Sequence, residues 1–358
     1  MSITEIAGYH VVRQLGAGGM GQVFLVQHPR LPRQDALKLL DAGVSRNSDF
    51  KARFLREADL LAHLSHQNIV TLYDRGEYED RLWITMEYID GTDASELLKA
   101  RGPVAPALAL ALITGAGAAL DYAWRKQRIT HRDVKPANIL LGVDGGELEA
   151  VKLADFGIAK AAGEATSLTS TGIAVGTMQY ISPEAIEGED VDNRADVYSL
   201  GCTAFHLLTG RPPYSGKSIT ALMNAHLTAE PPSVSDVAPQ LPAELDAVFA
   251  KALARQPDER YQSCAAFGDG LRAALEDQLG DARIARILDI DIGDQRLLHL
   301  IPVDLLQGLV GSTRFGGLDL HHHALAAVHA EAEGTGYAWA GEQRIDHDLL
   351  GGSRRRLE

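Results

Sequence analysis

Short apolar runs between polar turns fill the first part of the chain, and this pattern predicts β-strands. One segment has a different spacing. Phe54, Ala58 and Leu61 recur at intervals of three and four residues, which predicts a helix over residues 50–64, with an N-cap among residues 47–49. The predicted strands cover residues 11–15, 23–26, 36–40, 69–72 and 82–88.

After Gly91 the pattern changes to helices and loops. Apolar helices are predicted over residues 107–124, 195–208 and 243–254, and the second of them is followed by Gly210 and a proline pair, which end helices well. A small β-rich part followed by a large helical part predicts an α+β fold with two lobes and a cleft between them.

The uncharged stretch 104–120 raises the question of a membrane span. A span needs about 20 apolar residues, and this stretch is shorter, contains Pro106, Gly115 and Gly117, and is followed by Asp121. We therefore expect a buried core helix and no transmembrane segment in this chain.

A glycine cluster lies between the first two predicted strands. Gly16, Gly18, Gly21 and Val23 form the pattern GxGxxGxV. Such a hairpin can lay backbone N–H groups over phosphates, although a flexible hairpin without a ligand is the alternative for the glycines alone. A dinucleotide-binding turn would lead into a helix, whereas residues 23–26 are predicted to continue as a strand.

Lys38 lies between apolar neighbours on the next strand, and a buried ammonium needs an anionic partner. Glu57, on the predicted helix, is the candidate. Each residue alone would be an ordinary solvated side chain. Behind a glycine hairpin, the two together indicate an ion pair that positions the α- and β-phosphates of a nucleotide.

Two further segments carry the chemistry of phosphoryl transfer. The first, 130–141, reads THRDVKPANILL, and the second, 152–157, reads KLADFG. Transfer needs a carboxylate near the attacking hydroxyl, oxygen ligands for Mg²⁺ and positive charge at the phosphates. Asp133 supplies the first and Asn138 with Asp155 the second. Lys135 together with Lys38 supplies the third.

The combination HRDxKxxN followed by DFG is a known kinase signature. On these motifs the chain resembles the bacterial eukaryotic-like (Hanks-type) serine/threonine protein kinases, most of all the actinobacterial receptor-type kinases. The resemblance covers residues 9–275 and implies a bilobal kinase domain with an N-lobe at about 9–88 and a C-lobe at about 92–275. Residues 280–358 form a C-terminal extension of unknown fold.

The resemblance implies ATP as the phosphoryl donor, Mg²⁺ as the metal with Mn²⁺ as the alternative, and proteins as substrates. It implies that Met86 is the gatekeeper of a hinge at 86–89. It also implies that Glu184 pairs with Arg260 and that Asp196 braces the catalytic loop. The implied nucleotide-binding residues are Leu15, Gly16, Gly18, Gly21, Val23, Ala36, Lys38, Met86, Glu87, Ile89 and Leu140.

The acceptor and the regulation also follow from the resemblance. Lys135 with Thr177 marks a serine/threonine kinase. Arg132 directly precedes Asp133, and kinases with this arginine commonly hold an activation-loop phosphate with it. Thr169 and Thr171 match the autophosphorylated threonines of the family, and phosphorylation in trans implies a transient homodimer.

Composition and cysteine content bear on the class of protein and on its location in the cell. The formal net charge is −14, which argues against a general nucleic-acid binder. Cys202 and Cys264 form no CxxC pair, and the N-terminus lacks the basic and apolar regions of a signal peptide. A reducing, cytoplasmic location is the expectation.

The extension beyond residue 280 carries no recognisable motif. The acidic run 289–294 fails as a calcium loop because Leu300 stands where a glutamate is needed. The histidines at 321–323 with His329 indicate either a metal site or a polar helix end. Receptor-type relatives continue into a membrane helix and a sensor, and neither follows here, so a receptor function is in doubt.

Two other classes of protein are tested by the same residues. A pseudokinase scaffold is expected to have lost Lys38, Asp133 or Asp155, and all three are present. A small-molecule kinase is expected to lack the segment 176–184 that supports a peptide. The sequence therefore predicts an active protein serine/threonine kinase.

Overall fold

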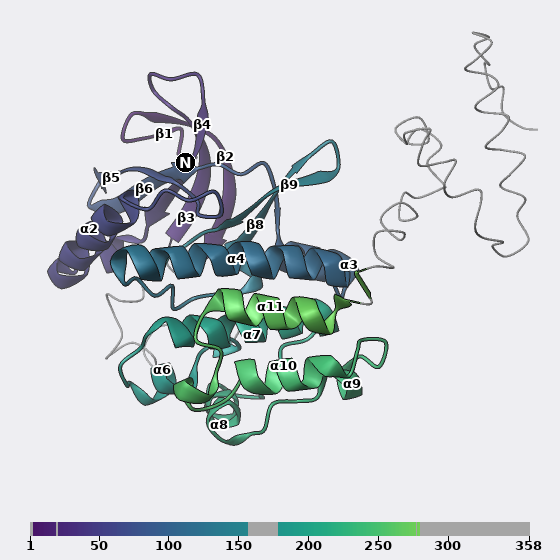
Figure 1. The fold of residues 1–358 in the computed structure, drawn as a ribbon. Helices are drawn as coiled ribbons and strands as arrows, with labels where there is room; N and C mark the ends of the chain where they lie inside the picture. Colours follow the sequence, from purple (N-terminus) through teal and green to yellow (C-terminus); the bar gives the residue numbers. More distant parts are fainter. Residues whose placement is uncertain (1–2, 19–20, 157–177, 277, 280–358) are drawn as a thin grey trace, which may run out of the picture. The chain divides into compact units, whose positions relative to one another are not determined.

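The fold is taken from a computed structural model, which describes residues 3–18, 21–156, 178–276 and 278–279. An antiparallel sheet of six strands forms the N-terminal lobe, in the order β1-β2-β3-β4-β6-β5. Figure 1 shows it above the helical part of the chain. The strands are β1 (Glu5–Ile6), β2 (Tyr9–Gly18), β3 (Gly21–Gln27), β4 (Gln34–Leu40), β5 (Leu72–Tyr78) and β6 (Arg81–Glu87).

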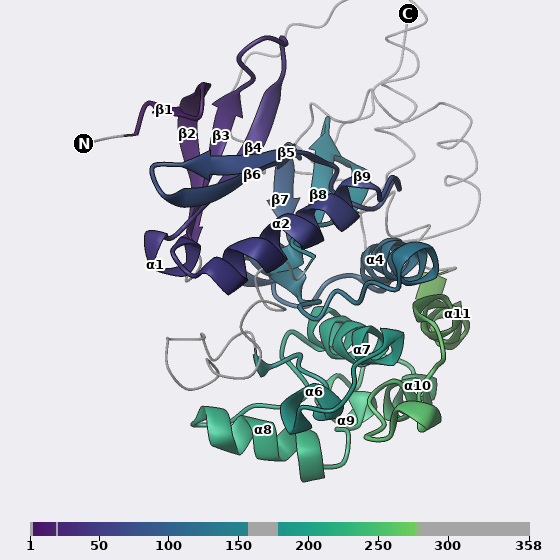
Figure 2. The same ribbon diagram turned by 90° about the vertical axis from the view of Figure 1, so that its left-hand side faces the viewer.

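Two helices, α1 (Ala42–Ser45) and α2 (Ser48–Ala62), complete this lobe. The predicted cap of α2 is confirmed, because the side chain of Asn47 accepts hydrogen bonds from the backbone N–H groups of residues 49 and 50. Phe50 and Phe54 on the buried face pack with Leu82 and Ile84 of β6. Figure 2 shows α2 lying across the strands.

The C-terminal lobe is mainly helical, as predicted, but it begins with a three-stranded sheet in the order β7-β8-β9. Its helices include two short 3-10 turns, η1 and η2. The strands are β7 (Gly91–Asp93), β8 (Ile139–Asp144) and β9 (Glu147–Leu153). The helices are α3 (Ala94–Arg101), α4 (Pro106–Gln127), η1 (Pro136–Asn138), α6 (Pro183–Glu187), α7 (Asn193–Thr209), α8 (Ile219–Thr228), α9 (Val234–Val237), α10 (Glu244–Ala252), η2 (Pro257–Glu259) and α11 (Cys264–Ala274).

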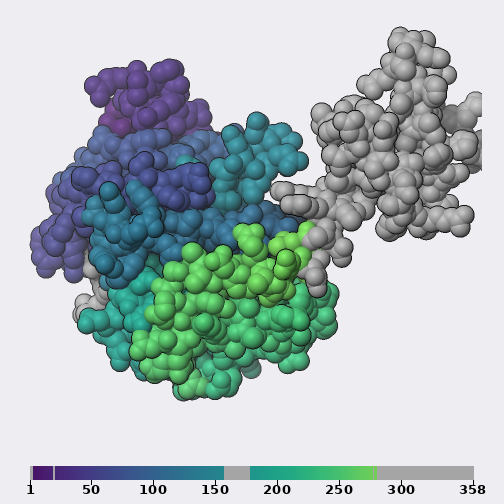
Figure 3. Space-filling model, viewed as in Figure 1, coloured from purple at the N-terminus to yellow at the C-terminus, as the bar shows by residue number. Residues whose placement is uncertain are grey.

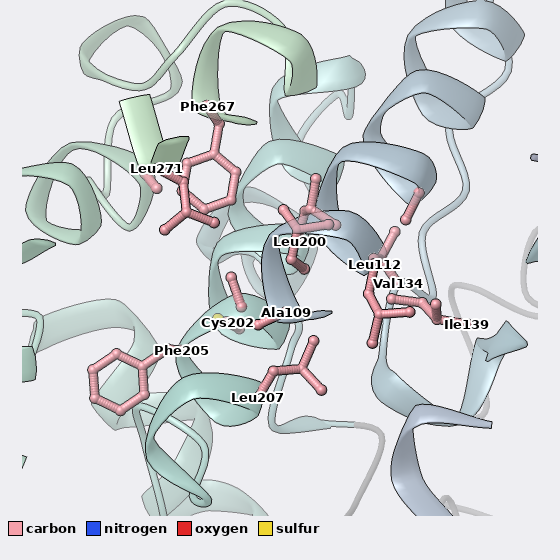
Figure 4. Close-up of a cluster of buried hydrophobic side chains, with 14 of the residues drawn as sticks. Ala109, Leu112, Val134, Ile139, Leu200, Cys202, Phe205, Leu207, Phe267 and Leu271 are labelled. Atoms are coloured by element: carbon pink, nitrogen blue, oxygen red, sulfur yellow. The ribbon is translucent and has the colours of Figure 1, made fainter. Parts of the chain in front are cut away.

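The core of this lobe lies between α4, α7 and α11. Leu112 of α4, Leu200 of α7 and Leu271 of α11 are fully buried in one apolar cluster (Figure 4). Full burial of each such side chain stabilises the folded chain by about 1.5–3 kcal/mol. Figure 3 shows α4 and α11 side by side on the surface of this face.

Helix α4 is the only helix among the described residues that is long and apolar enough to cross a membrane. Its apolar side chains pack into the lobe core with α7, α11 and β9 instead. The predicted core helix is therefore confirmed.

The segment between α2 and β5 is hydrogen-bonded to β9 of the C-terminal lobe. The N–H of Val70 donates to the carbonyl of Leu153 at 3.0 Å, and the N–H of Leu153 donates to the carbonyl of Asn68 at 2.8 Å. The predicted strand over residues 69–72 is wrong in its bounds. Ile69 forms an isolated bridge with Leu153 of β9, and the edge strand β5 begins only at Leu72.

Candidate active site

The glycine cluster forms the hairpin between β2 and β3, as predicted. Gly18 pairs with Gly21 at its tip. Gly21 has a φ of +145°, and a Cβ there would lie 2.2 Å from the carbonyl oxygen of Leu39, so only glycine fits. A Cβ on Gly16 or Gly18 would meet nothing within 4 Å. Open space therefore lies beside these two positions of the hairpin.

Residues predicted to bind the nucleotide lie on neighbouring strands. Val23 of β3 is paired with Lys38 of β4, and Ala36 of β4 is paired with Met86 of β6. Leu140 lies in the other lobe, on β8, where it is paired with Asp93. The predicted hinge consists of the end of β6, which includes Glu87, and the start of the segment that leads to β7, which includes Ile89.

Lys38 forms an ion pair across the two lobes. Its Nζ lies 2.7 Å from Oδ2 of Asp155, just beyond the end of β9. The ion pair that the described residues show for Lys38 is the one with Asp155, so the pairing of Lys38 with Glu57 stays a prediction. Both carboxylates are suitable partners by charge, and their distances from Lys38 are set by tertiary packing.

The ion pair determines the charge state of Asp155. Burial alone raises the pKa of this carboxyl group, but the charge of Lys38 and its hydrogen bond outweigh burial and hold the pKa below its ordinary value. Asp155 is therefore an anion at neutral pH.

The three predicted residues of the catalytic loop converge on one point. Oδ2 of Asp133 accepts hydrogen bonds from Nζ of Lys135 at 2.8 Å and from Nδ2 of Asn138 at 3.2 Å. Nδ2 of Asn138 also donates to the backbone carbonyl of Asp133 at 2.7 Å. Because the amide nitrogen faces Asp133, the amide oxygen is the atom that is directed elsewhere.

The loop is held from below by Asp196 at the start of α7, as predicted. This buried carboxylate accepts the backbone N–H groups of His131 at 2.8 Å and of Arg132 at 3.0 Å. Arg132 has a left-handed φ of 61°, which these bonds help to stabilise. Burial raises the pKa of Asp196 to about 6, although the two N–H donors and Arg132 act in the opposite direction.

His131 connects the loop to the segment that carries Asp155. Its Nδ1 accepts the N–H of Asp133 at 3.2 Å, so Nε2 carries the proton and donates to the carbonyl of Ala154 at 2.9 Å. The ring packs on Phe156 with a centroid distance of 4.6 Å. His131 thus links the loop that carries Asp133 to the segment that carries Asp155.

Glu184 and Arg260 form the predicted ion pair. The carboxylate of Glu184 accepts from both terminal nitrogens of Arg260, at 2.8 and 2.7 Å, and both side chains are buried. The remaining N–H groups of Arg260 donate to the backbone carbonyls of Ala254, Arg194 and Arg255. All five donors are used, which is the condition for a buried ion pair to be tolerated.

Sequence reasoning missed the side-chain role of Glu87. Its carboxylate accepts from Nζ of Lys152 on β9 at 2.7 Å and from the backbone N–H of Thr71 at 3.1 Å. The pair ties the hinge to the C-terminal lobe. No short motif marks it, because the partners are far apart in the sequence. Thr169, Thr171 and Thr177, and the extension from residue 280, lie outside the described residues.

The fold and this arrangement of side chains define the class of protein. A family model described as "Protein kinase domain" matches residues 9–269. The chain belongs to the protein kinase family.

Its relatives are bacterial serine/threonine kinases. The chain is 49% identical over 281 residues to the serine/threonine-protein kinase PknF of Mycobacterium tuberculosis, covering 78% of this chain and 58% of that protein. It is 48% identical over 271 residues to PknJ of the same organism, covering 75% of this chain and 46% of that protein. The chain thus spans about half the length of the curated relatives it matches.

A solved structure agrees with the fold. The crystal structure of the Mycobacterium tuberculosis PknI kinase domain matches with a TM-score of 0.63 and 38% sequence identity, covering 77% of this chain and all of that one. The predicted bilobal kinase fold is confirmed.

Proposed function

We propose that this chain transfers the γ-phosphoryl group of ATP to serine and threonine hydroxyls of proteins. The observation that carries the proposal is the meeting of two sets of side chains. Lys38 of the N-terminal lobe holds Asp155, while Asp133, Lys135 and Asn138 of the catalytic loop share hydrogen bonds. Together they supply the carboxylates, the oxygen ligands and the positive charge that phosphoryl transfer requires.

Asp133 orients the substrate hydroxyl and accepts its proton as the oxygen attacks the γ-phosphorus. Lys135, already hydrogen-bonded to Asp133, neutralises charge on the phosphoryl group in transfer. Lys38 binds the α- and β-phosphates. Glu57 on α2 is the proposed alternative partner of Lys38, in the state in which Asp155 serves the metal.

The donor set fits a hard divalent cation. Asp155 presents an anionic carboxylate, and Asn138 directs its amide oxygen away from Asp133. Oxygen donors of this kind are what Mg²⁺ prefers. The family uses ATP with a divalent metal, and we propose Mg²⁺, with Mn²⁺ as the alternative, held by Asn138 and Asp155. When bound, the cation supplies charge that offsets the charge of the phosphates.

The adenine site is proposed from the hinge. The backbone N–H of Glu87 is used by the carbonyl of Thr71 at 2.8 Å, so we assign its carbonyl and the N–H of Ile89 to the base. Val23, Ala36 and Leu140 enclose the base from the two lobes. Leu15 and the glycines of the hairpin cover the sugar and phosphates.

Activation by autophosphorylation of Thr169 and Thr171 is part of the proposal. Its support is the position of Arg132 beside Asp133, where the loop is braced by Asp196. A phosphate carries about −1.5 to −2 charge and three acceptor oxygens, which suit a guanidinium. Transfer in trans would take place in a transient homodimer.

We assign the kinase domain to residues 9–275 and place it in the cytoplasm. The domain assignment is supported by the contacts within the chain, which separate residues 1–284 from the rest. The cytoplasmic location is supported by Cys202 and Cys264, which are both buried free thiols, as a reducing compartment allows. The protein substrates are defined only by their serine and threonine acceptors.

The experiment is phosphoamino-acid analysis. The whole chain is incubated with Mg²⁺, γ-labelled ATP and a generic protein substrate, and the products are hydrolysed in acid. We expect phosphoserine and phosphothreonine, with essentially no phosphotyrosine, and label on the peptide that carries Thr169 and Thr171. Dominant phosphotyrosine would refute the assigned acceptor, and an unlabelled loop peptide would refute the proposed activation.

A further inference from the structure

Three side chains form a bridge from the first long strand to the hinge. Nη2 of Arg13, on β2, donates to the hydroxyl of Tyr88 at 3.2 Å. That hydroxyl donates to Oδ1 of Asp90, also at 3.2 Å. The carbonyl of Asp90 in turn accepts the N–H of Val143 on β8 at 3.0 Å. We call Arg13, Tyr88 and Asp90 the strand–hinge bridge.

The bridge lies at a defined place in the proposed nucleotide site. Arg13 comes two residues before Leu15 on the strand that runs into the glycine hairpin. Tyr88 lies between Glu87 and Ile89, whose backbone groups are assigned to the base. The bridge therefore connects the strand that covers the nucleotide to the segment that binds it.

The polarity of the three groups is matched. The Tyr88 hydroxyl accepts from a guanidinium and donates to a carboxylate, so each hydrogen bond involves a charged partner. Arg13 and Asp90 are exposed, and Tyr88 is half-buried. Solvent screening at such a surface keeps the interaction modest, which suits a bridge that opens to admit and release a ligand.

The hydrogen bonds of the sheet do not connect β2 directly to the hinge. In the strand order, β2 pairs only with β1 and β3, and the hinge follows β6, which is separated from β2 by β3 and β4. A side-chain link is therefore required to hold β2 against the hinge directly.

We propose that the strand–hinge bridge is a positioning device that holds the glycine-rich strand over the bound nucleotide and tunes nucleotide affinity. Arg13, Tyr88 and Asp90 act through β2 and are not catalytic residues. The inference rests on the proposed function for the identity of the nucleotide. Its effect falls on ATP binding, because the groups that act on the γ-phosphate are left in place.

The test uses Tyr88→Phe, which removes the hydroxyl and keeps the ring. The hydroxyl takes part in two exposed hydrogen bonds. Because solvent screening keeps each of them weak, we expect their loss to raise the Kd of ADP and the KM for ATP about 3- to 10-fold. The turnover number, the KM for the protein substrate and the thermal unfolding midpoint are expected to stay unchanged. Tyr73→Phe is the matched control, because Tyr73 is a half-exposed tyrosine on β5 whose hydroxyl has no hydrogen bond among the described residues.

A double-mutant cycle distinguishes the bridge from independent local effects. Arg13→Ala is expected to raise the Kd of ADP as much as Tyr88→Phe does, and the double variant no further. Arg13→Lys, which keeps the charge but reaches less far, is expected to fall between Arg13→Ala and the unmutated chain. An unchanged Kd in both single variants, or effects that simply add, would overturn the proposal.

The Kd of ADP also separates this proposal from the proposed function. If the unmutated chain binds ADP but transfers no phosphate, the proposed function fails and the Kd comparison still decides the bridge. If the unmutated chain transfers phosphate and Tyr88→Phe has an unchanged Kd, the bridge alone fails. If the chain binds no nucleotide, both fail.

Discussion

Two backbone N–H groups of the catalytic loop, those of His131 and Arg132, are directed at one buried carboxylate. Asp196 accepts both most strongly as an anion, because protonation turns one oxygen into a hydroxyl, which is a weaker acceptor. Its pKa of about 6 lies above the ordinary value of 3.8. The folded chain therefore binds this proton more tightly than the unfolded chain. The stability from the neutral carboxyl is complete at low pH and is lost as the pH rises through about 6.

The turnover number is expected to change with pH in the opposite direction to this contribution to stability. We predict that the turnover number falls as the pH drops through about 6, because protonation of Asp196 weakens its hydrogen bond to one N–H of the loop. Asp196→Asn, which cannot accept both N–H groups, should reduce turnover at pH 7.5 by roughly 10-fold or more and remove this inflection. The measurement is turnover against pH from about 5 to 8 for both proteins. The same inflection in the variant would show that another group causes it.

At the scale of elements, the hydrophobic pattern predicted four of the longer helices and missed other elements, including the amphipathic helix α11. Helices α2, α4, α7 and α10 were predicted. Helices α2 and α10 each have one buried apolar face, whereas α7 is an apolar run that is buried on nearly all sides. Strand β5 reads LYDRGEY and lies at the edge of the sheet, so it lacks the apolar alternation of a half-buried strand. Strand β7 has three residues, and its pairing with β8 depends on contacts distant in the sequence.

The connection of α6 to the turn at η2 provides a test at the same scale. Glu184→Gln leaves Arg260, which is fully buried, without its counter-charge. We predict that the free energy of unfolding falls by about 3–5 kcal/mol. Urea denaturation followed by tryptophan fluorescence measures it.

Glu230→Gln is the matched control for that variant. Glu230 pairs with Arg255, but its side chain is 88% exposed, so the change should stay within about 1 kcal/mol. Equal losses in the two variants would show that burial of the Glu184–Arg260 pair does not determine its contribution.

At the scale of the whole molecule, the site depends on contacts between lobes that local sequence does not contain. The motifs predicted Asp133, Lys135 and Asn138 as one group, because these residues are close in the chain. They did not predict the ion pair of Lys38 with Asp155, because these two residues are far apart in the chain and are brought together by lobe packing. Arg13 and Tyr88 carry no motif and are 75 residues apart, so only the fold reveals them.

The central claim is that these assembled groups transfer phosphate, and Asp133→Asn tests it most directly. The variant keeps the size of the side chain and removes the proton acceptor. With Mg²⁺, γ-labelled ATP and a protein substrate, we predict a loss of roughly 100-fold or more in transfer rate, with the Kd of ADP unchanged. Asp144→Asn, at the exposed end of β8, should retain full activity. Transfer by Asp133→Asn at the rate of the unmutated chain would contradict the account.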